Sequence, residues 1–188
     1  LNYGIFALHA VLMAMFIAMP FSLRDAGLPV AQHWHVYLPV MLLSFVLMLP
    51  AVMKSGKGAR LKRYFIGAVA LVLLAQVLLS ALPAQVWPLA VVLLTFFTAF
   101  NVLEAMLPSL ISRMAPPQAK GAALGVYSSV QFLGTFVGSA AGGYAYGQWG
   151  AMGVTVLCGT LAAVWLAVAA GMKIPDRGAH PVAQAPAA

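Results

Sequence analysis

The chain has 188 residues, of which 63% are hydrophobic and only 7% are charged, and its mean hydropathy is +0.97. Because soluble domains carry about 25% charged residues, this composition excludes a soluble globular fold. The formal net charge of +7 would suggest nucleic acid for a soluble protein. Here the basic residues lie between apolar runs, where charge sets orientation in a membrane. The sequence therefore predicts an all-α, polytopic membrane protein with no nucleic-acid partner.

Six apolar runs are long enough to cross a bilayer, which takes about 20 residues per helix. The predicted spans are residues 3–23, 36–53, 64–82, 88–111, 122–142 and 151–172. Together they predict a six-helix transmembrane bundle over residues 1–173. The stretch at residues 174–188 is rich in Pro and Ala, which predicts a disordered cytoplasmic tail.

Basic residues mark one side of the predicted bundle. The stretch at residues 54–63 holds five cations and no anion, so the positive-inside rule makes it cytoplasmic, and its cations also suit anionic lipid headgroups. Alternation of six spans puts only Arg24 on the opposite side. Both chain ends are therefore expected in the cytoplasm. The cytoplasmic set is Lys54, Lys57, Arg60, Lys62, Arg63, Arg113, Lys120, Lys173 and Arg177.

Glu104 is the only acidic residue inside an apolar span, where an ionisable group is costly and is a candidate functional group. Thr98, Asn101 and Glu104 recur every three residues, which brings them near one helical face. Such a stripe is expected to face the bundle interior or a water-filled cavity. Pro108 cannot donate to the Glu104 carbonyl. A carboxyl group in this setting can exchange a proton near neutral pH. The alternative is that Glu104 only pins one helix to the next.

Two further polar residues lie inside apolar spans and have two interpretations each. His9 in the first span could handle a proton or contact a substrate, or it could simply hydrogen-bond to a neighbouring helix. Gln131 in the fifth span could hydrogen-bond to a substrate or, again, to a neighbouring helix. With Asn101 and Glu104, these residues form the candidate path for substrate and proton.

Glycines recur at four-residue spacing around and within the fifth span. They are Gly121 and Gly125, followed by Gly134, Gly138 and Gly142. Small residues at this spacing let two helix backbones approach closely, so the pattern predicts a helix-packing face. The functional alternative is that this packing face forms an interface that slides or rocks during a transport cycle.

The motifs of known intramembrane enzymes and of one channel class are not matched by this sequence. A rhomboid-type protease needs a G-x-S-G serine with a histidine on a later span, an aquaporin needs two Asn-Pro-Ala motifs, and a paired-carboxylate catalyst needs a second membrane carboxylate. His9, His33, His35 and Cys158 lack the spacing of a zinc site. We therefore expect no enzymatic activity, no metal site and no cofactor.

The pattern of spans and motifs resembles the C-terminal half of a major facilitator superfamily transporter, and within that family the YajR-type branch of drug:proton antiporter-like proteins. The resemblance covers roughly residues 1–175. The stretches that carry it are LNYGIFALH at the start, HWHVYLP before the second span, AFNVLEAMLPSLIS in the fourth and KGAALGVYSSVQFLGTFVG in the fifth.

The resemblance implies that the six spans correspond to helices seven to twelve of a twelve-helix transporter. The cations Lys54, Lys57, Arg60, Lys62 and Arg63 would then belong to a cytoplasmic gating loop. The family pattern of that loop, G-x-x-x-D-R-x-G-R-[RK], is degenerate here, because Gly56, Gly58 and two of the cations remain but the Asp is missing. The family's substrate cavity lies between two halves near the membrane midplane. His9, Asn101, Glu104 and Gln131 are the residues expected to face it.

The function expected from this resemblance is secondary active transport in a bacterial inner membrane, as proton-coupled efflux of small molecules or drugs by alternating access. The expected partners are the lipid bilayer, a small-molecule substrate, the proton, and the N-terminal six-helix half that is missing from this sequence, or a second copy in its place. We expect the sequence to be part of a longer chain. The rival hypothesis is a non-transporting six-span membrane scaffold or assembly subunit.

Overall fold

A computed structural model of the chain describes residues 1–56 and 58–172. All regular structure in these two ranges is helical, which confirms the all-α prediction. Five of the helices are long and apolar enough to cross a membrane. Lys57, Lys173, Arg177 and the predicted tail at residues 174–188 lie outside the described residues.

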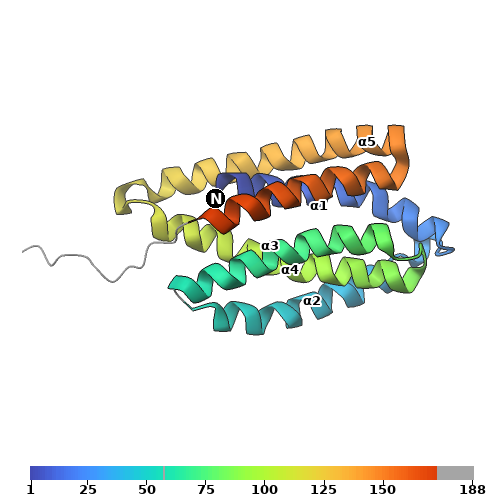
Figure 1. Cartoon of the computed structure of the whole chain (residues 1–188), viewed down its shortest axis with the longest axis horizontal. Coiled ribbons are helices and arrows are strands. Elements are labelled where there is room, and N and C mark those ends of the chain that lie inside the picture. The colour runs from blue at the N-terminus through green and yellow to red at the C-terminus, as the bar shows by residue number, and fades with distance from the viewer. Residues whose placement is uncertain (57, 173–188) are drawn as a thin grey trace, which may run out of the picture.

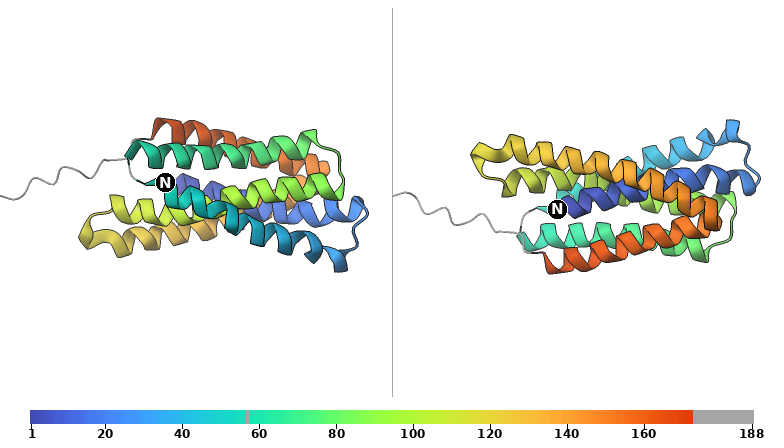
Figure 2. Two further views of the ribbon diagram at one scale, coloured as in Figure 1. Left: turned by 90° about the horizontal axis from the view of Figure 1, so that it is seen from below. Right: turned by 90° about the horizontal axis from the view of Figure 1, so that it is seen from above.

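The helices run back and forth along one axis and form an elongated bundle (Figures 1 and 2). The expected spans lie within them except for residues 82 and 172, which directly follow α3 and α5, and the last two spans both fall on α5. The elements in chain order are α1 (Asn2–Asp25), the 3-10 turn η1 (Val30–Gln32), α2 (Trp34–Ser55), α3 (Gly58–Ala81), α4 (Val86–Met114), the 3-10 turn η2 (Pro117–Ala119) and α5 (Lys120–Gly171).

Helix α5 is broken at Gly150, which has φ 61° and ψ −152°. A positive φ costs glycine little because it lacks a Cβ, and here it lets the chain fold back on itself (Figure 1). The first arm, residues 120–149, and the second arm, residues 151–171, meet near the break. A Cβ added at Gly153 would lie 2.6 Å from the carbonyl oxygen of Ala145. The first arm contains the span expected at residues 122–142, and the second arm contains the span expected at residues 151–172 except for its last residue.

The basic residues gather at one end of the bundle. The start of α1, the α2–α3 turn, the α4–α5 connection and the end of the second arm all lie at this end (Figure 1). We call it the basic end; its cations among the described residues are Lys54, Arg60, Lys62, Arg63, Arg113 and Lys120. Arg24 lies at the opposite end, where it forms an ion pair with Asp25 at 3.4 Å.

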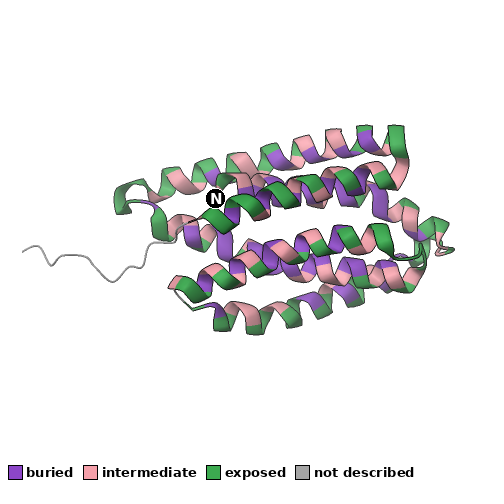
Figure 3. Cartoon of the chain, viewed as in Figure 1, coloured by how far each residue is buried: buried purple, intermediate pink, exposed green. Residues whose placement is uncertain are grey.

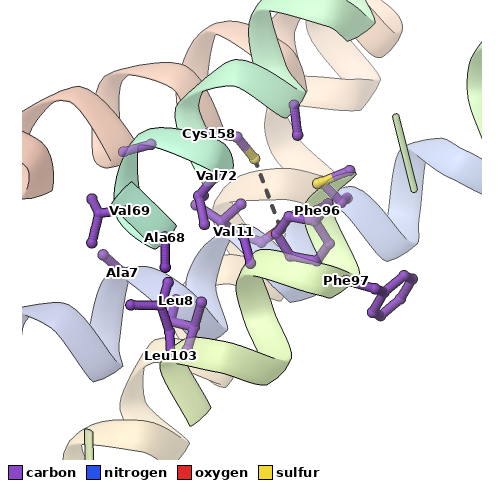
Figure 4. Close-up of a cluster of buried hydrophobic side chains, with 14 of the residues drawn as sticks. Ala7, Leu8, Val11, Ala68, Val69, Val72, Phe96, Phe97, Leu103 and Cys158 are labelled. Atoms are coloured by element: carbon purple, nitrogen blue, oxygen red, sulfur yellow. Dashed lines mark hydrogen bonds between the residues drawn. The ribbon is translucent and has the colours of Figure 1, made fainter. Parts of the chain in front are cut away.

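The core lies where α1, α3, α4 and the second arm of α5 meet. Figure 4 shows Leu8 and Val11 of α1 with side chains from α3 and α4 around them. The Cys158 thiol lies against this cluster, 3.9 Å from the carbonyl oxygen of Val11. Burial is uneven among the helices (Figure 3). Twelve residues of α1 are buried, whereas α2 buries only Val36, Val40, Ser44 and Ser55.

Candidate functional site

Three polar side chains from three helices meet inside the bundle. His9 of α1 lies between Gln131 of the first arm of α5 and Glu104 of α4. The imidazole Nε2 is 2.8 Å from the Gln131 amide nitrogen and 3.8 Å from Oε2 of Glu104. We call these three residues the polar triad. They were singled out separately in the sequence, and the fold brings them together.

The contacts of His9 fit one neutral tautomer. Its Nδ1 is 3.2 Å from the carbonyl oxygen of Ile5, one turn earlier in α1. A carbonyl can only accept, so Nδ1 carries the proton and Nε2 is left as an acceptor. The Gln131 amide then donates its N–H to Nε2. The edge of the ring also packs against Phe100 of α4, at 5.7 Å between ring centroids, which helps to fix the orientation of the imidazole.

Glu104 has a less complete set of partners. Its Oε2 atom is buried and, within the described part of the chain, makes no hydrogen bond. The side chain as a whole is 36% exposed, so the carboxyl group lies at the edge of the bundle with one oxygen turned inward. Pro108 lies inside α4 and cannot donate to the Glu104 carbonyl. This helix turn therefore combines a carbonyl that lacks its i+4 donor with an incompletely bonded carboxyl group.

The glycine stripe explains why Gln131 reaches His9. A Cβ added at Gly134, Gly138 or Gly142 would come within 3.0 Å of backbone atoms of α1, specifically at Phe6, Ala10 and Ala14. Such distances are closer than side chains tolerate, so the two backbones touch only because these positions are glycine. Gly121 and Gly125 differ, because a Cβ added there would meet nothing within 4 Å in the described part of the chain. The close contact thus covers the later part of the pattern.

Asn101 lies apart from the polar triad. It is buried between α4 and α2, where its amide donates to the Ser44 hydroxyl at 2.9 Å, and Ser44 in turn donates to the carbonyl oxygen of Met41 at 2.7 Å. The expected common face with Glu104 fails because three residues turn an α-helix by about 300°, so each step falls about 60° short of a full turn. Thr98, Asn101 and Glu104 therefore point in three directions.

The cations expected to form a gating loop divide between two places. Lys62 donates from its ammonium group to the carbonyl oxygen of Ala170, at 2.9 Å, and so joins α3 to the last turn of the second arm. Arg60 and Arg63 instead line a groove between α2, α3 and α4. Lys54 is in the last turn of α2, and Lys57 lies outside the described residues.

Sequence reasoning missed three residues around these contacts. Ser44 and Phe100 have no feature that marks them before the helices are placed. Tyr127 precedes Gln131 by four residues and so lies on the same face of the first arm. Its hydroxyl is buried and has no hydrogen-bond partner among residues 1–56 and 58–172. The spacing from Gln131 is the signal that could have revealed it.

In the polar triad the imidazole and the carboxyl group lie at ion-pair distance, with Nε2 and Oε2 3.8 Å apart, which is longer than a hydrogen bond. Within the described ranges no three His, Cys, Asp or Glu side chains gather as metal ligands would. The imidazole also contacts the side-chain amide of Gln131, a group that can donate or accept a hydrogen bond.

Comparisons with known proteins agree with the fold and its apolar helices. A sequence model described as Major Facilitator Superfamily matches residues 1–188. The chain is 45% identical over 175 residues to the inner membrane transport protein YajR of Escherichia coli (strain K12), which is 93% of this chain and 38% of that protein. It is 30% identical over 135 residues to an uncharacterized transporter of Buchnera aphidicola subsp. Acyrthosiphon pisum, covering 72% of this chain and 35% of that protein.

Proposed function

Since this chain belongs to the Major Facilitator Superfamily, we propose that it forms half of a secondary active transporter that exports small molecules in exchange for protons. The chain spans 38% of the length of its Escherichia coli relative and 35% of its Buchnera relative. Transport by alternating access would therefore involve a second bundle, either an N-terminal six-helix half or a second copy. In this proposal the two arms of α5 cross the membrane separately, which gives six crossings.

The polar triad is the observation that carries the proposal. Glu104 lies about ten residues before the end of α4 at Met114, or roughly 15 Å along the helix, and His9 lies about 10 Å from the start of α1. Both groups are thus well inside a hydrocarbon core of about 30 Å. Ionisable groups at such depth are costly and are usually part of a substrate or proton path.

Proton binding would change which helices the triad connects. A proton added at Nε2 of His9 removes the acceptor of the Gln131 N–H, so the amide must rotate or withdraw. The new Nε2–H can donate to Oε2 of Glu104, now 3.8 Å away. When the amide withdraws, the α1–α5 hydrogen bond is lost and an α1–α4 ion pair forms; when the amide rotates, its oxygen competes with Glu104 for the same N–H. Protonation would thereby bias how α5 packs against α1, which is the coupling that antiport needs.

Exposed apolar faces flank the polar triad and suit the second bundle. Phe132 and Phe136 on the first arm are each 71% exposed, and α2 exposes Leu42, Val46 and Leu49. Contiguous apolar surface can face either lipid or protein in a membrane. We propose that the substrate passes between these faces and the second bundle, past Glu104, His9 and Gln131. Asn101 fastens α2 to α4 beside this path.

In the same proposal, the basic end forms the cytoplasmic side of the transporter. With nine of the ten cations expected on one side, the positive-inside rule puts the basic end and both chain ends in the cytoplasm. The name of the Escherichia coli relative supports a bacterial inner membrane. The cations of the α2–α3 turn would close the cytoplasmic mouth, with Lys62 holding α3 to α5.

The test is a transport assay on Glu104→Gln, which keeps the shape and removes the charge. Ethidium efflux is measured in vesicles with an imposed pH gradient. We expect the gradient-driven efflux of the variant to fall at least tenfold while membrane insertion is unchanged. Asn101→Leu is the matched control, since it removes a polar group from the same helix away from the triad, and it should retain most activity. Wild-type efflux by Glu104→Gln at every pH would reject the proton role.

The rival scaffold function is favoured by one contact. Asn101 and Ser44 join only α2 to α4, as expected of a polar group that serves packing alone. A scaffold should tolerate Glu104→Gln with no transport phenotype. The convergence of three helices at the polar triad is the reason for preferring transport.

A further inference from the structure

We propose that the groove between α2, α3 and α4 at the basic end binds one anionic phospholipid, with its phosphate held by Arg60 and Arg63 and one acyl chain lying in the groove. This inference is independent of the transport proposal. It rests on the groove, its charge and its depth in the membrane.

The groove is a cavity of about 600 Å³, within the range of pockets that hold small molecules. Helix α2 contacts α3 only slightly and lies mainly against α4, and the groove is lined by residues of all three helices. Leu47 of α2 and Leu71 of α3 line it, 44% and 37% exposed. Apart from the hydroxyls of Tyr64 and Thr98, the lining below the arginines is apolar.

The two arginines lie together at the mouth of the groove. Arg60 and Arg63 lie in the first turns of α3, about 60° apart around the helix, and both exposed side chains line the groove. Neither guanidinium forms an ion pair with any carboxylate among the residues placed in the structure. A planar guanidinium pairs well with phosphate oxygens. Two unpaired cations beside an apolar groove complement an anionic headgroup with an attached chain.

The dimensions match one leaflet. Leu71 lies eight residues beyond Arg63, which is about 12 Å along α3. One leaflet contributes about 15 Å of hydrocarbon. The groove therefore begins at headgroup depth and ends near the midplane, as an acyl chain in that leaflet does. By the positive-inside rule this is the cytoplasmic leaflet, whose surface is rich in anionic lipid.

Gly67 forms an open part of the groove wall. It is exposed and lines the groove, and a Cβ added there would meet no atom of residues 1–56 or 58–172 within 4 Å. A large side chain at this position would fill the groove without a steric clash against the bundle. Gly147 is equally unobstructed but lies far from the groove, near the opposite end of the first arm. The pair provides a blocking variant and its control.

The experiment is native mass spectrometry of the complete, purified protein titrated with dioleoylphosphatidylglycerol at about 0.15 M ionic strength, where the screening length is about 8 Å. We expect Arg60→Gln/Arg63→Gln to weaken binding about thirtyfold, because each cation near the headgroups contributes roughly fivefold. The control Arg113→Gln/Lys120→Gln removes the same charge from the basic end but not from the groove. Its binding should change less than about threefold.

Gly67→Phe should weaken phosphatidylglycerol binding at least tenfold, whereas Gly147→Phe should leave it unchanged. Equal losses in the two charge variants would reject the site in favour of general surface attraction. Unaltered binding in Gly67→Phe would reject an acyl chain in the groove. Competition by glycerol 3-phosphate at lipid-like concentrations would show that the arginines bind free phosphate esters instead, and would likewise overturn the proposal.

Discussion

Helices α1 and α2 are both apolar enough to cross a membrane, yet they differ sharply in burial. Helix α1 is enclosed by α5, α4 and the core, with a glycine stripe against its backbone. Helix α2 leaves most of its leucines exposed and lies mainly against α4. The comparison shows that hydropathy determines whether a helix can cross the membrane, but not whether it is buried inside the bundle. Lipid is as apolar as leucine, so small residues and polar contacts decide which helices pack.

Among the variants that test this difference in packing between α1 and α2, Gly138→Leu is expected to have the largest effect. The new side chain would overlap the backbone of α1 at Ala10; overpacking typically costs about 1–3 kcal/mol and occasionally more, and a clash with backbone belongs at the upper end. We expect loss of the folded, monodisperse protein in detergent, read by size-exclusion chromatography and thermal unfolding. Gly125→Leu adds the same volume at a position where no described residue comes within 4 Å of an added Cβ, and it should leave both readouts near wild type. Equal stability of the two variants would refute the close α1–α5 contact.

A smaller and more specific effect is expected from Gln131→Leu. It removes the N–H that donates to His9 but preserves the adjacent glycine contacts. Folding should be retained, because one hydrogen bond contributes about 1 kcal/mol. The pH dependence of ethidium efflux should shift, since His9 loses the donor that favours its neutral form. The control is Gln118→Leu, an exposed glutamine of η2. An unshifted pH profile in Gln131→Leu would separate the amide from proton coupling.

The smallest effect is expected where α2 joins the bundle. Asn101→Leu breaks the hydrogen bond to Ser44, and such interhelical bonds in membranes average about 0.6 kcal/mol. A slight decrease in thermal stability should follow. The Ser44→Ala and Asn101→Leu changes should not be additive, because they remove the same contact. Full additivity in this double-mutant cycle would mean that the pair does not interact.

The sequence predicted the helices well because each membrane span must satisfy its own backbone hydrogen bonds and needs about 20 apolar residues. Residues 122–142 and 151–172 show this best. They fall on either side of Gly150 even though the helical assignment runs continuously through α5. The four-residue spacing of Gly134, Gly138 and Gly142 likewise predicted that they pack against another helix.

The partners of the polar residues could not be predicted. Asn101 and Glu104 are three residues apart, but the helix rotates them towards α2 and towards α1 respectively. Which helix lies in each direction depends on the packing of the whole bundle. The meeting of His9 with Gln131 joins positions far apart in the chain. Periodicity within a single helix contains no information about such contacts, so the triad became visible only in the fold.

The most direct test of the account is to measure proton release when substrate binds to the purified complete protein. Ethidium is added to the protein in weakly buffered detergent solution, and a pH-sensitive dye reports protons released per protein. If Glu104 and His9 share the coupled proton, the wild type should release a proton on binding and Glu104→Gln should release almost none while still folding. Equal release by both proteins would contradict the assignment of proton coupling to the polar triad.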